Sequence, residues 1–342
     1  MANENLASLE ALLGNEKAKQ ESIENMTEYV DLDEIKFAKA SIQAQQESIV
    51  SIFNSKPAYQ VVCSQSGYMA KVSALVYKDI VAITNSNLSN LETKRETYRV
   101  LFSKITGYSA QKWRPTFEQW LEATSLGDVE TLFYGLYCAT FQDESTIRFD
   151  CPYDDCGETN IIKINNKQLI RVEDRAEMLE LTNRISKEAD TVEKIKEFSS
   201  VVKNKTNMKN LRLPESKIIF TIKLPSLAKV LDVLKTYSDA ELATLSNDAL
   251  NIILSTEAVA IPDSEGNYSY ITDKKDYAGV IEMLSVSDIS VLKNVVTKLF
   301  ASKHITYCVE HQECTACKRK INKIPLDMEA LLFFQISEKQ LS

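Results

Sequence analysis

Apolar positions recur at helical spacing along much of the chain, and short runs of β-branched and aromatic residues interrupt them. Residues 1–56 are rich in Glu, Lys, Gln, Asn and Ala and carry only a thin apolar stripe. Such a stripe is typical of a helix that packs on a partner or on the outside of a core, although the composition equally fits a partly mobile tail. The stripe consists of Leu6, Leu9, Leu12, Leu13, Ile35, Phe37, Ile42 and Ile49.

Residues 58–142 predict a hairpin followed by helices. Val and Tyr dominate residues 58–83, and the centre at Gln65, Ser66 and Gly67 is typical of a turn. We therefore expect a β-hairpin that runs into a helix. Residues 87–142 then show helical periodicity, and Asp128 is placed to cap the last of these helices.

The remaining sequence predicts strands around the cysteines and a helix-rich stretch between them. Residues 145–149 and 160–164 read as strands because β-branched and aromatic residues dominate them. Residues 165–212 read as charged and helical, 217–224 as a strand, and helices follow to residue 303. The chain then returns to strand, cysteine pair, strand and a final helix. No internal tandem repeat and no low-complexity segment is visible.

Composition narrows the classes of function. The chain has 342 residues, 44% of them hydrophobic, and a net charge of −8, so a broad phosphate-binding surface is not expected. The first 20 residues are too polar for a signal peptide, and we find no apolar run of about 18 residues, so no membrane span is expected. A basic tract over residues 194–212 has little aromatic character and reads as a solvated or protein-docking loop.

The stretch CPYDDCG, residues 151–157, reads as half of a metal site. Gly157 can take the positive φ that a sharp turn after the second cysteine favours, and Pro152 stiffens the entry. Such a turn, a knuckle, points two thiolates at one ion. Structural zinc is normally four-coordinate, so the half-site requires a second pair.

Cys314 and Cys317 form the other close pair, and strand-like runs flank it as well. Together with Cys151 and Cys156 they give C-x4-C…C-x2-C, the plan of a zinc ribbon built on two hairpins. The 157 residues between the pairs far exceed the usual interval of about 15–20. We therefore expect a four-cysteine Zn²⁺ site, with residues 165–303 inserted between its two hairpins.

Several alternatives to this ligand set remain open. His311 or Cys308 can replace one of the four cysteines, and the four thiols can also stand without a metal. Cys63 and Cys138 lie in apolar runs and are expected in the core. His304 reads as a polar residue at a helix end.

A site with four cysteine ligands leaves no open position for an activated water, so the zinc is expected to be structural. The sequence carries no Ser-His-Asp set, no Walker loop, no G-x-G-x-x-G and no H-E-x-x-H. We therefore expect no enzyme, although an unrecognised active site stays an alternative.

One longer pattern resembles a known family. It combines the Gly67 hairpin, the helix that Asp128 opens, the Cys-Pro knuckle and the run CTACKRKINKIPLDMEALLFF. These features, over residues 58–165 and 300–340, resemble the baseplate-assembly proteins of T-even-type contractile-tailed bacteriophages, a family that contributes to the central hub. The resemblance implies a virion protein that is made in the host cytoplasm and binds other tail proteins in a symmetric multi-subunit assembly.

The predicted fold is α+β and mainly helical, with small zinc-ribbon hairpins and a helix-rich insertion. The predicted domains are an N-terminal helical segment, 1–56, a main domain of 57–164 with 304–342, and an insertion, 165–303. The alternative function is a cytoplasmic zinc-ribbon protein that binds nucleic acid. It requires a basic knuckle surface, which Lys318, Arg319 and Lys320 offer and which Asp154, Asp155 and Glu158 oppose.

Overall fold

The computed structural model describes Ser41 and residues 58–84, 89–141, 144–199, 201, 208–300 and 305–340. The chain divides into two compact units, residues 1–52 with 333–342, and residues 53–332. The second unit holds nearly all the described residues. The predicted N-terminal helix and His304 lie outside the described residues, and the predicted domain boundaries stay predictions.

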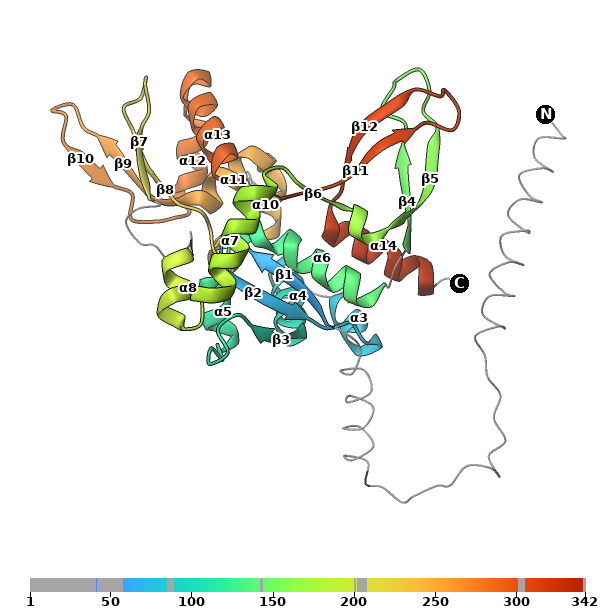
Figure 1. Ribbon diagram of the computed structural model, residues 1–342. Helices are drawn as coiled ribbons and strands as arrows, with labels where there is room; N and C mark the ends of the chain where they lie inside the picture. Colours follow the sequence, from blue (N-terminus) through green and yellow to red (C-terminus); the bar gives the residue numbers. More distant parts are fainter. Residues whose placement is uncertain are drawn as a thin grey trace, which may run out of the picture. The chain divides into compact units, whose positions relative to one another are not determined.

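Several helices begin where the sequence supplies a capping side chain. Ser89, Thr116 and Ser238 each form a capping box with the side chain three residues on, which satisfies two backbone groups at the helix start. Figure 1 labels the helices. They are α3 Tyr77–Ile83, α4 Asn90–Lys104, α5 Phe117–Ala123, α6 Val129–Thr140, α7 Arg175–Glu188, α8 Val192–Phe198, α9 Leu227–Thr236, α10 Asp239–Thr244, α11 Asn247–Ser255, α12 Asp276–Glu282, α13 Val286–Phe300 and α14 Met328–Gln340, with short 3₁₀ turns η2 Leu126–Asp128 and η3 Asn166–Gln168.

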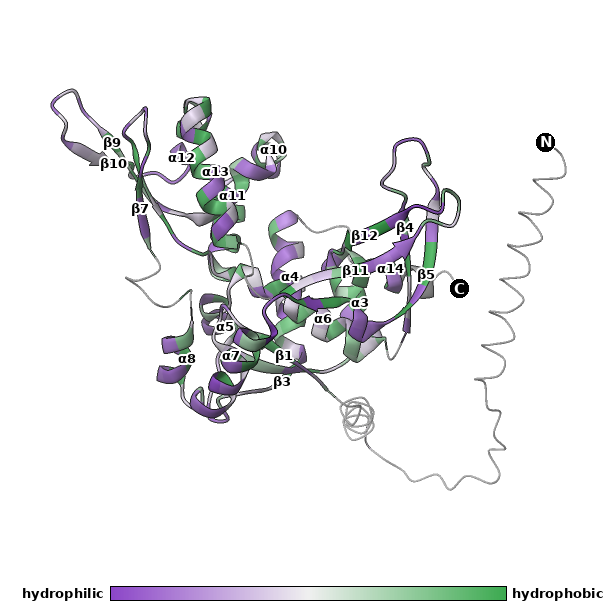
Figure 2. Ribbon diagram, turned by 45° about the horizontal axis from the view of Figure 1, so that its top comes forward, coloured by the Kyte–Doolittle hydropathy of each residue, from purple (hydrophilic) through white to green (hydrophobic). Residues whose placement is uncertain are grey.

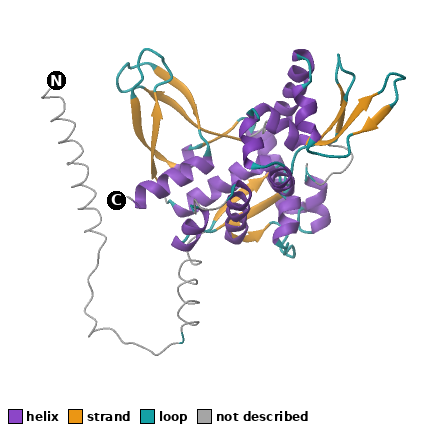
Figure 3. Ribbon diagram, turned by 180° about the vertical axis from the view of Figure 1, so that it is seen from behind, coloured by secondary structure: helices purple, strands orange, loops and turns teal. Residues whose placement is uncertain are grey.

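Within the described ranges, the strands form four small antiparallel sheets with the orders β1-β2-β3, β10-β9-β8-β7, β12-β11-β6 and β4-β5. Figure 3 shows these strands in orange and the helices in purple. The strands are β1 Tyr59–Cys63, β2 Tyr68–Val72, β3 Ile105–Tyr108, β4 Glu144–Asp150, β5 Thr159–Asn165, β6 Ile170–Val172, β7 Lys209–Arg212, β8 Ile219–Ile222, β9 Thr256–Pro262, β10 Tyr268–Tyr270, β11 Ile305–Glu313 and β12 Lys320–Pro325.

The prediction of a mainly helical fold was wrong. The described residues are 47% helix and 25% strand, a mixed fold. The difference arises where short strands lie in segments that the sequence pattern assigned to helix. β6 and β7 lie within the charged stretch 165–212, and β9 starts directly at the end of α11.

A buried aromatic and aliphatic core joins α6 to the β1-β2-β3 sheet. α6 is buried over most of its length, and a side chain at Gly135 would meet Val61 at 2.7 Å, so glycine permits the close approach of helix and sheet. Tyr68 and Trp120 are fully buried and share a hydrogen bond of 3.1 Å from the indole N–H. By contrast, Figure 2 shows hydrophilic residues along α7 and α8.

Asp128 lies at the start of α6 but its carboxylate does not cap that helix. It accepts hydrogen bonds from the backbone N–H and hydroxyl of Ser66, at 2.6 and 2.7 Å, and from the N–H of Gln65 at 3.4 Å. Burial raises the pKa of Asp128 to about 6, although these donors lower it. The residue therefore fixes the tip of the β1–β2 hairpin, a long-range role in place of the predicted local one.

Glu130, on α6, forms a hydrogen bond with the backbone at the start of α14. Its carboxylate accepts a hydrogen bond of 2.9 Å from the N–H of Met328. Burial raises its pKa from 4.5 to about 7, and Asp327 and Glu329 add to the rise while Lys94 opposes it. Because the folded-state pKa lies above the unfolded one, this group's contribution to stability is complete below pH 4.5 and is lost as the pH rises through about 7.

Glu130→Gln should remove this pH dependence. The amide oxygen can still accept the Met328 hydrogen bond, while the variant leaves no charge to bury. At pH 8 the variant should be more stable than the wild type by about 1–2 kcal/mol, after a discount for partial exposure, and at pH 4.5 the two should be equal. Urea unfolding at both pH values measures this, and the same slope with pH in the variant would assign the dependence to another group.

Candidate metal centre

Two hairpins carry one cysteine knuckle each, at residues 151–157 and 314–318. β4 and β5 pair up to Asp150 and Thr159, and β11 and β12 pair up to Glu313 and Lys320. A backbone hydrogen bond closes the base of each knuckle, from Cys151 N–H to the Glu158 carbonyl at 2.8 Å and from Cys314 N–H to the Arg319 carbonyl at 3.0 Å. The two hairpins lie side by side (Figures 1 and 3).

Both knuckles use a positive φ directly after the second cysteine. Gly157 has φ +61° and Lys318 has φ +60°. The prediction for Gly157 is confirmed. Lys318 adopts the same backbone conformation although it is not glycine, which costs about 1–2 kcal/mol. The rest of the knuckle must therefore hold Lys318 in this conformation.

Cys151, Cys156, Cys314 and Cys317 meet between the hairpins. Their sulfur atoms all lie within 4.8 Å of one another. Sγ of Cys151 is 3.8 Å from Sγ of Cys317, and Sγ of Cys156 is 3.7 Å from Sγ of Cys314. A tetrahedron with metal–sulfur bonds of about 2.3 Å has sulfur–sulfur edges of about 3.8 Å. The four cysteines therefore lie close enough to hold one metal ion.

The two knuckles differ in how readily their thiols ionise. The backbone of Cys317, aided by Ala316 and Asn160, lowers the pKa of Cys314 to about 6. The backbone and side chain of Arg319 lower the pKa of Cys317. Burial raises the pKa of Cys151 to about 12. The second knuckle is therefore prepared to bind a cation as thiolates, and the ion must displace the proton from the first.

Asn160 and Arg319 surround the sulfurs, and sequence reasoning missed both. Asn160 is 1% exposed and donates to Sγ of Cys314 at 3.6 Å while its oxygen accepts from the Thr315 N–H at 2.8 Å. Arg319 donates to Sγ of Cys317 at 3.4 Å. Such contacts orient ligands and tune their charge, but no residue spacing identifies them in advance.

Arg319 also ties the second knuckle to the first. Its guanidinium pairs with Asp155 and lies 4.1 Å from the ring centroid of Tyr153, whose hydroxyl donates to the Lys320 carbonyl at 2.9 Å. These contacts bring the knuckles together through the protein alone. A metal ion bound by the four sulfurs would therefore complete an arrangement that the chain already favours.

The other candidate ligands lie elsewhere among the described residues. Cys308 is buried in β11 and His311 is exposed on the same strand, and neither belongs to the four-sulfur cluster. Cys63 and Cys138 are both buried, which agrees with their expected place in the core.

Comparisons with known proteins identify no relative of this chain. No family model, curated protein or solved structure matches the chain. Within the described part of the chain, no helix is both long enough and apolar enough to cross a membrane.

Proposed function

We propose that the four cysteines bind one structural zinc ion. The four-sulfur cluster carries this proposal, because thiolates at tetrahedral spacing favour zinc among the common biological cations. Cysteines at all four positions leave none for a reacting water, so the ion has no catalytic role. It joins two hairpins that 157 residues separate in the sequence.

The protein that this zinc stabilises is, in our proposal, a structural and assembly component of a contractile phage tail, placed in the hub region of the baseplate. It binds other tail proteins, is made in the host cytoplasm and ends in the virion. The resemblance of residues 58–165 and 300–340 to baseplate-assembly proteins supports this, and a structural rather than catalytic metal site agrees with it.

Contractile tails purified from the source of this sequence test the assignment. Mass spectrometry of the intact tails and of baseplates released from them should find the chain in a fixed ratio to other baseplate proteins. A chain absent from tails, from baseplates and from assembly intermediates captured with them would refute a role in tail assembly.

A nucleic-acid-binding zinc ribbon has weaker support. Lys318, Arg319 and Lys320 lie beside the second knuckle, but Arg319 is already paired with Asp155. We therefore expect no retardation of DNA or RNA by the zinc-loaded protein at physiological salt, and retardation there would favour the alternative.

A further inference from the structure

Two segments of the described chain have a similar order of helices and strands. Residues 59–165, the first module, run through a hairpin, helices, a third strand, two further α-helices and a cysteine hairpin. Residues 209–325, the second module, repeat this order with one added strand, β10, after the third strand; β7, β8 and β9 take the places of β1, β2 and β3, and α13 takes the place of α6. Each module ends in one knuckle of the metal centre.

The strand registers of the two modules agree residue by residue. Val61 pairs with Ala70 as Leu211 pairs with Phe220. The third strand of each module pairs with the second strand, and the register of this pairing shifts at the same place. The shift lies between Lys71 and Val72 in the first module and between Thr221 and Ile222 in the second. Just beyond it, Ser73 N–H donates to the Lys104 carbonyl at 2.9 Å, and Lys223 N–H donates to the Ser255 carbonyl at 2.8 Å.

The hairpin tips also match. Gly67 has φ +76° and Lys217 has φ +59° at the same position of the turn. Asp128 holds the first tip through Ser66 and Gln65. Asp288, at the start of α13, holds the second through the N–H groups of Ser216 and Glu215, at 2.8 and 2.9 Å. The residues of one module can therefore be assigned to those of the other by counting.

α14, which follows the second module, seats its first turn on the first module. Met328 N–H donates to Glu130, and Glu329 forms an ion pair of 2.7 Å with Lys94. Met328 and Leu332 are both 0% exposed, whereas Ala330 between them is exposed. The seat lies between α4 and α6, around Lys94, Tyr98 and Glu130.

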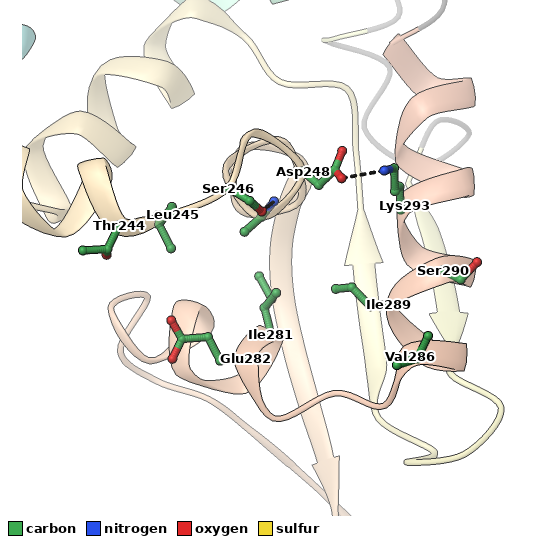
Figure 4. Close-up of a pocket in the computed structure, with 11 residues that line it drawn as sticks. Thr244, Leu245, Ser246, Asp248, Ile281, Glu282, Val286, Ile289, Ser290 and Lys293 are labelled. Atoms are coloured by element: carbon green, nitrogen blue, oxygen red, sulfur yellow. Dashed lines mark hydrogen bonds and ion pairs between the residues drawn. The ribbon is translucent and has the colours of Figure 1, made fainter.

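The equivalent seat on the second module is an open groove of about 540 Å³. Counting back from Lys104 and Ser255, Tyr98 corresponds to Ala249 on α11, and Lys94 corresponds by count to Leu245, which lies just before α11 begins. Counting on from Asp128 and Asp288, Glu130 corresponds to Ser290. Figure 4 shows this groove between α11 and α13, where Leu245, Ala249 and Ser290 are among the lining residues.

Smaller side chains and an ion pair shape this groove. Alanine stands in place of Tyr98 and serine in place of Glu130, which explains why the groove is hollow. Lys293 pairs with Asp248 at 2.6 Å across it. Val286 lies on its rim and is 85% exposed.

The chain contains a second copy of the α14 first turn. The residue before α14 and its first five residues read Asp327, Met328, Glu329, Ala330, Leu331, Leu332, and residues 8–13 read Ser8, Leu9, Glu10, Ala11, Leu12, Leu13. The last four residues are identical, serine replaces aspartate at the capping position, and leucine replaces methionine. Residues 8–13 lie outside the described residues, and more than 40 residues separate them from the start of β1.

We propose that residues 8–13 of a second copy of this chain bind in the groove of the second module as a helical turn. Leu9 and Leu13 take the places that Met328 and Leu332 take on the first module, and Glu10 reaches Lys293. The choice of a second copy rests on the proposed assembly function. Because donor and acceptor are different surfaces, the contact is head-to-tail and can extend beyond a dimer.

Sedimentation velocity of the full-length, zinc-loaded chain at increasing concentration tests this proposal. Wild type should self-associate. Leu9→Lys changes the residue that corresponds to the buried Met328 and should weaken association at least about tenfold. Ala11→Lys introduces the same side chain at the position of exposed Ala330 and should behave as wild type. Ser290→Trp should block the groove, whereas Ser287→Trp, exposed on α13 outside it, should not.

Mixing the Leu9→Lys and Ser290→Trp variants should restore association, because one supplies the groove and the other the segment. A monomeric wild type would overturn the proposal, whether the segment is unbound or occupies the groove of its own chain. Association that persists in both variants would also overturn it. This measurement uses purified protein alone, so its outcome is independent of whether the chain is found in phage tails.

Discussion

Replacing Cys314 by serine is expected to abolish zinc binding and to loosen both cysteine hairpins at once. In the proposed zinc centre the two pairs share one ion, so the loss of one thiolate should release the other knuckle as well. Structural zinc contributes roughly 10 kcal/mol or more in small zinc peptides, so the loss of stability should exceed about 4 kcal/mol. Zinc content, melting temperature and limited proteolysis around residues 151–157 and 314–318 measure it.

Cys308→Ser is the matched control, because Cys308 lies in β11, the strand that leads into the second knuckle, but outside the four-cysteine cluster. Its side chain is 1% exposed, so a buried hydroxyl should cost about 1–3 kcal/mol while zinc content stays unchanged. Equal loss of zinc in the two variants, or loss in Cys308→Ser alone, would show that the ligands are assigned wrongly.

Gly67→Ala is expected to destabilise the first module strongly. Gly67 has φ +76°, and an added Cβ would lie 2.7 Å from both Ser199 N and the Phe198 Cβ, at the end of α8. The end of α8 must therefore move away from the hairpin tip that Asp128 holds. Backbone strain and the steric clash together should cost about 3 kcal/mol or more, measured as the shift in urea unfolding of the zinc-loaded protein.

Gly266→Ala separates the two causes. Gly266 has φ +87° in the turn between β9 and β10, and an added Cβ would meet nothing within 4 Å. It therefore carries the backbone strain alone, about 1 kcal/mol. If both variants lost the same stability, the contact between Gly67 and α8 would have no energetic weight.

The metal cluster was predictable because its signal is local. Each cysteine pair has strand-like residues on both sides, and Pro152 and Gly157 mark the first turn. The supporting contacts were not predictable, since Asn160 and Arg319 are ordinary polar residues whose role depends on a hairpin more than 150 residues away. Asp128 was assigned to its own helix for the same reason: its true partners, Gln65 and Ser66, are distant in sequence.

The two-module organisation was invisible in the sequence because the backbone is preserved and the side chains are not. Over the aligned residues 61–73 and 211–223, only Ser66 and Ser216 are identical. Even the left-handed turn position changes from Gly67 to Lys217. Short strands such as β7 and β9 lie within charged or helical-looking segments, so their pairing in a sheet overrode the local pattern.

Zinc K-edge X-ray absorption on the purified full-length chain, together with elemental analysis, tests the four-cysteine zinc centre most directly. We predict one zinc per chain, bound by four sulfur atoms at about 2.3 Å. A folded preparation made with zinc available that contains none, or a spectrum that requires nitrogen or oxygen ligands, would contradict this assignment.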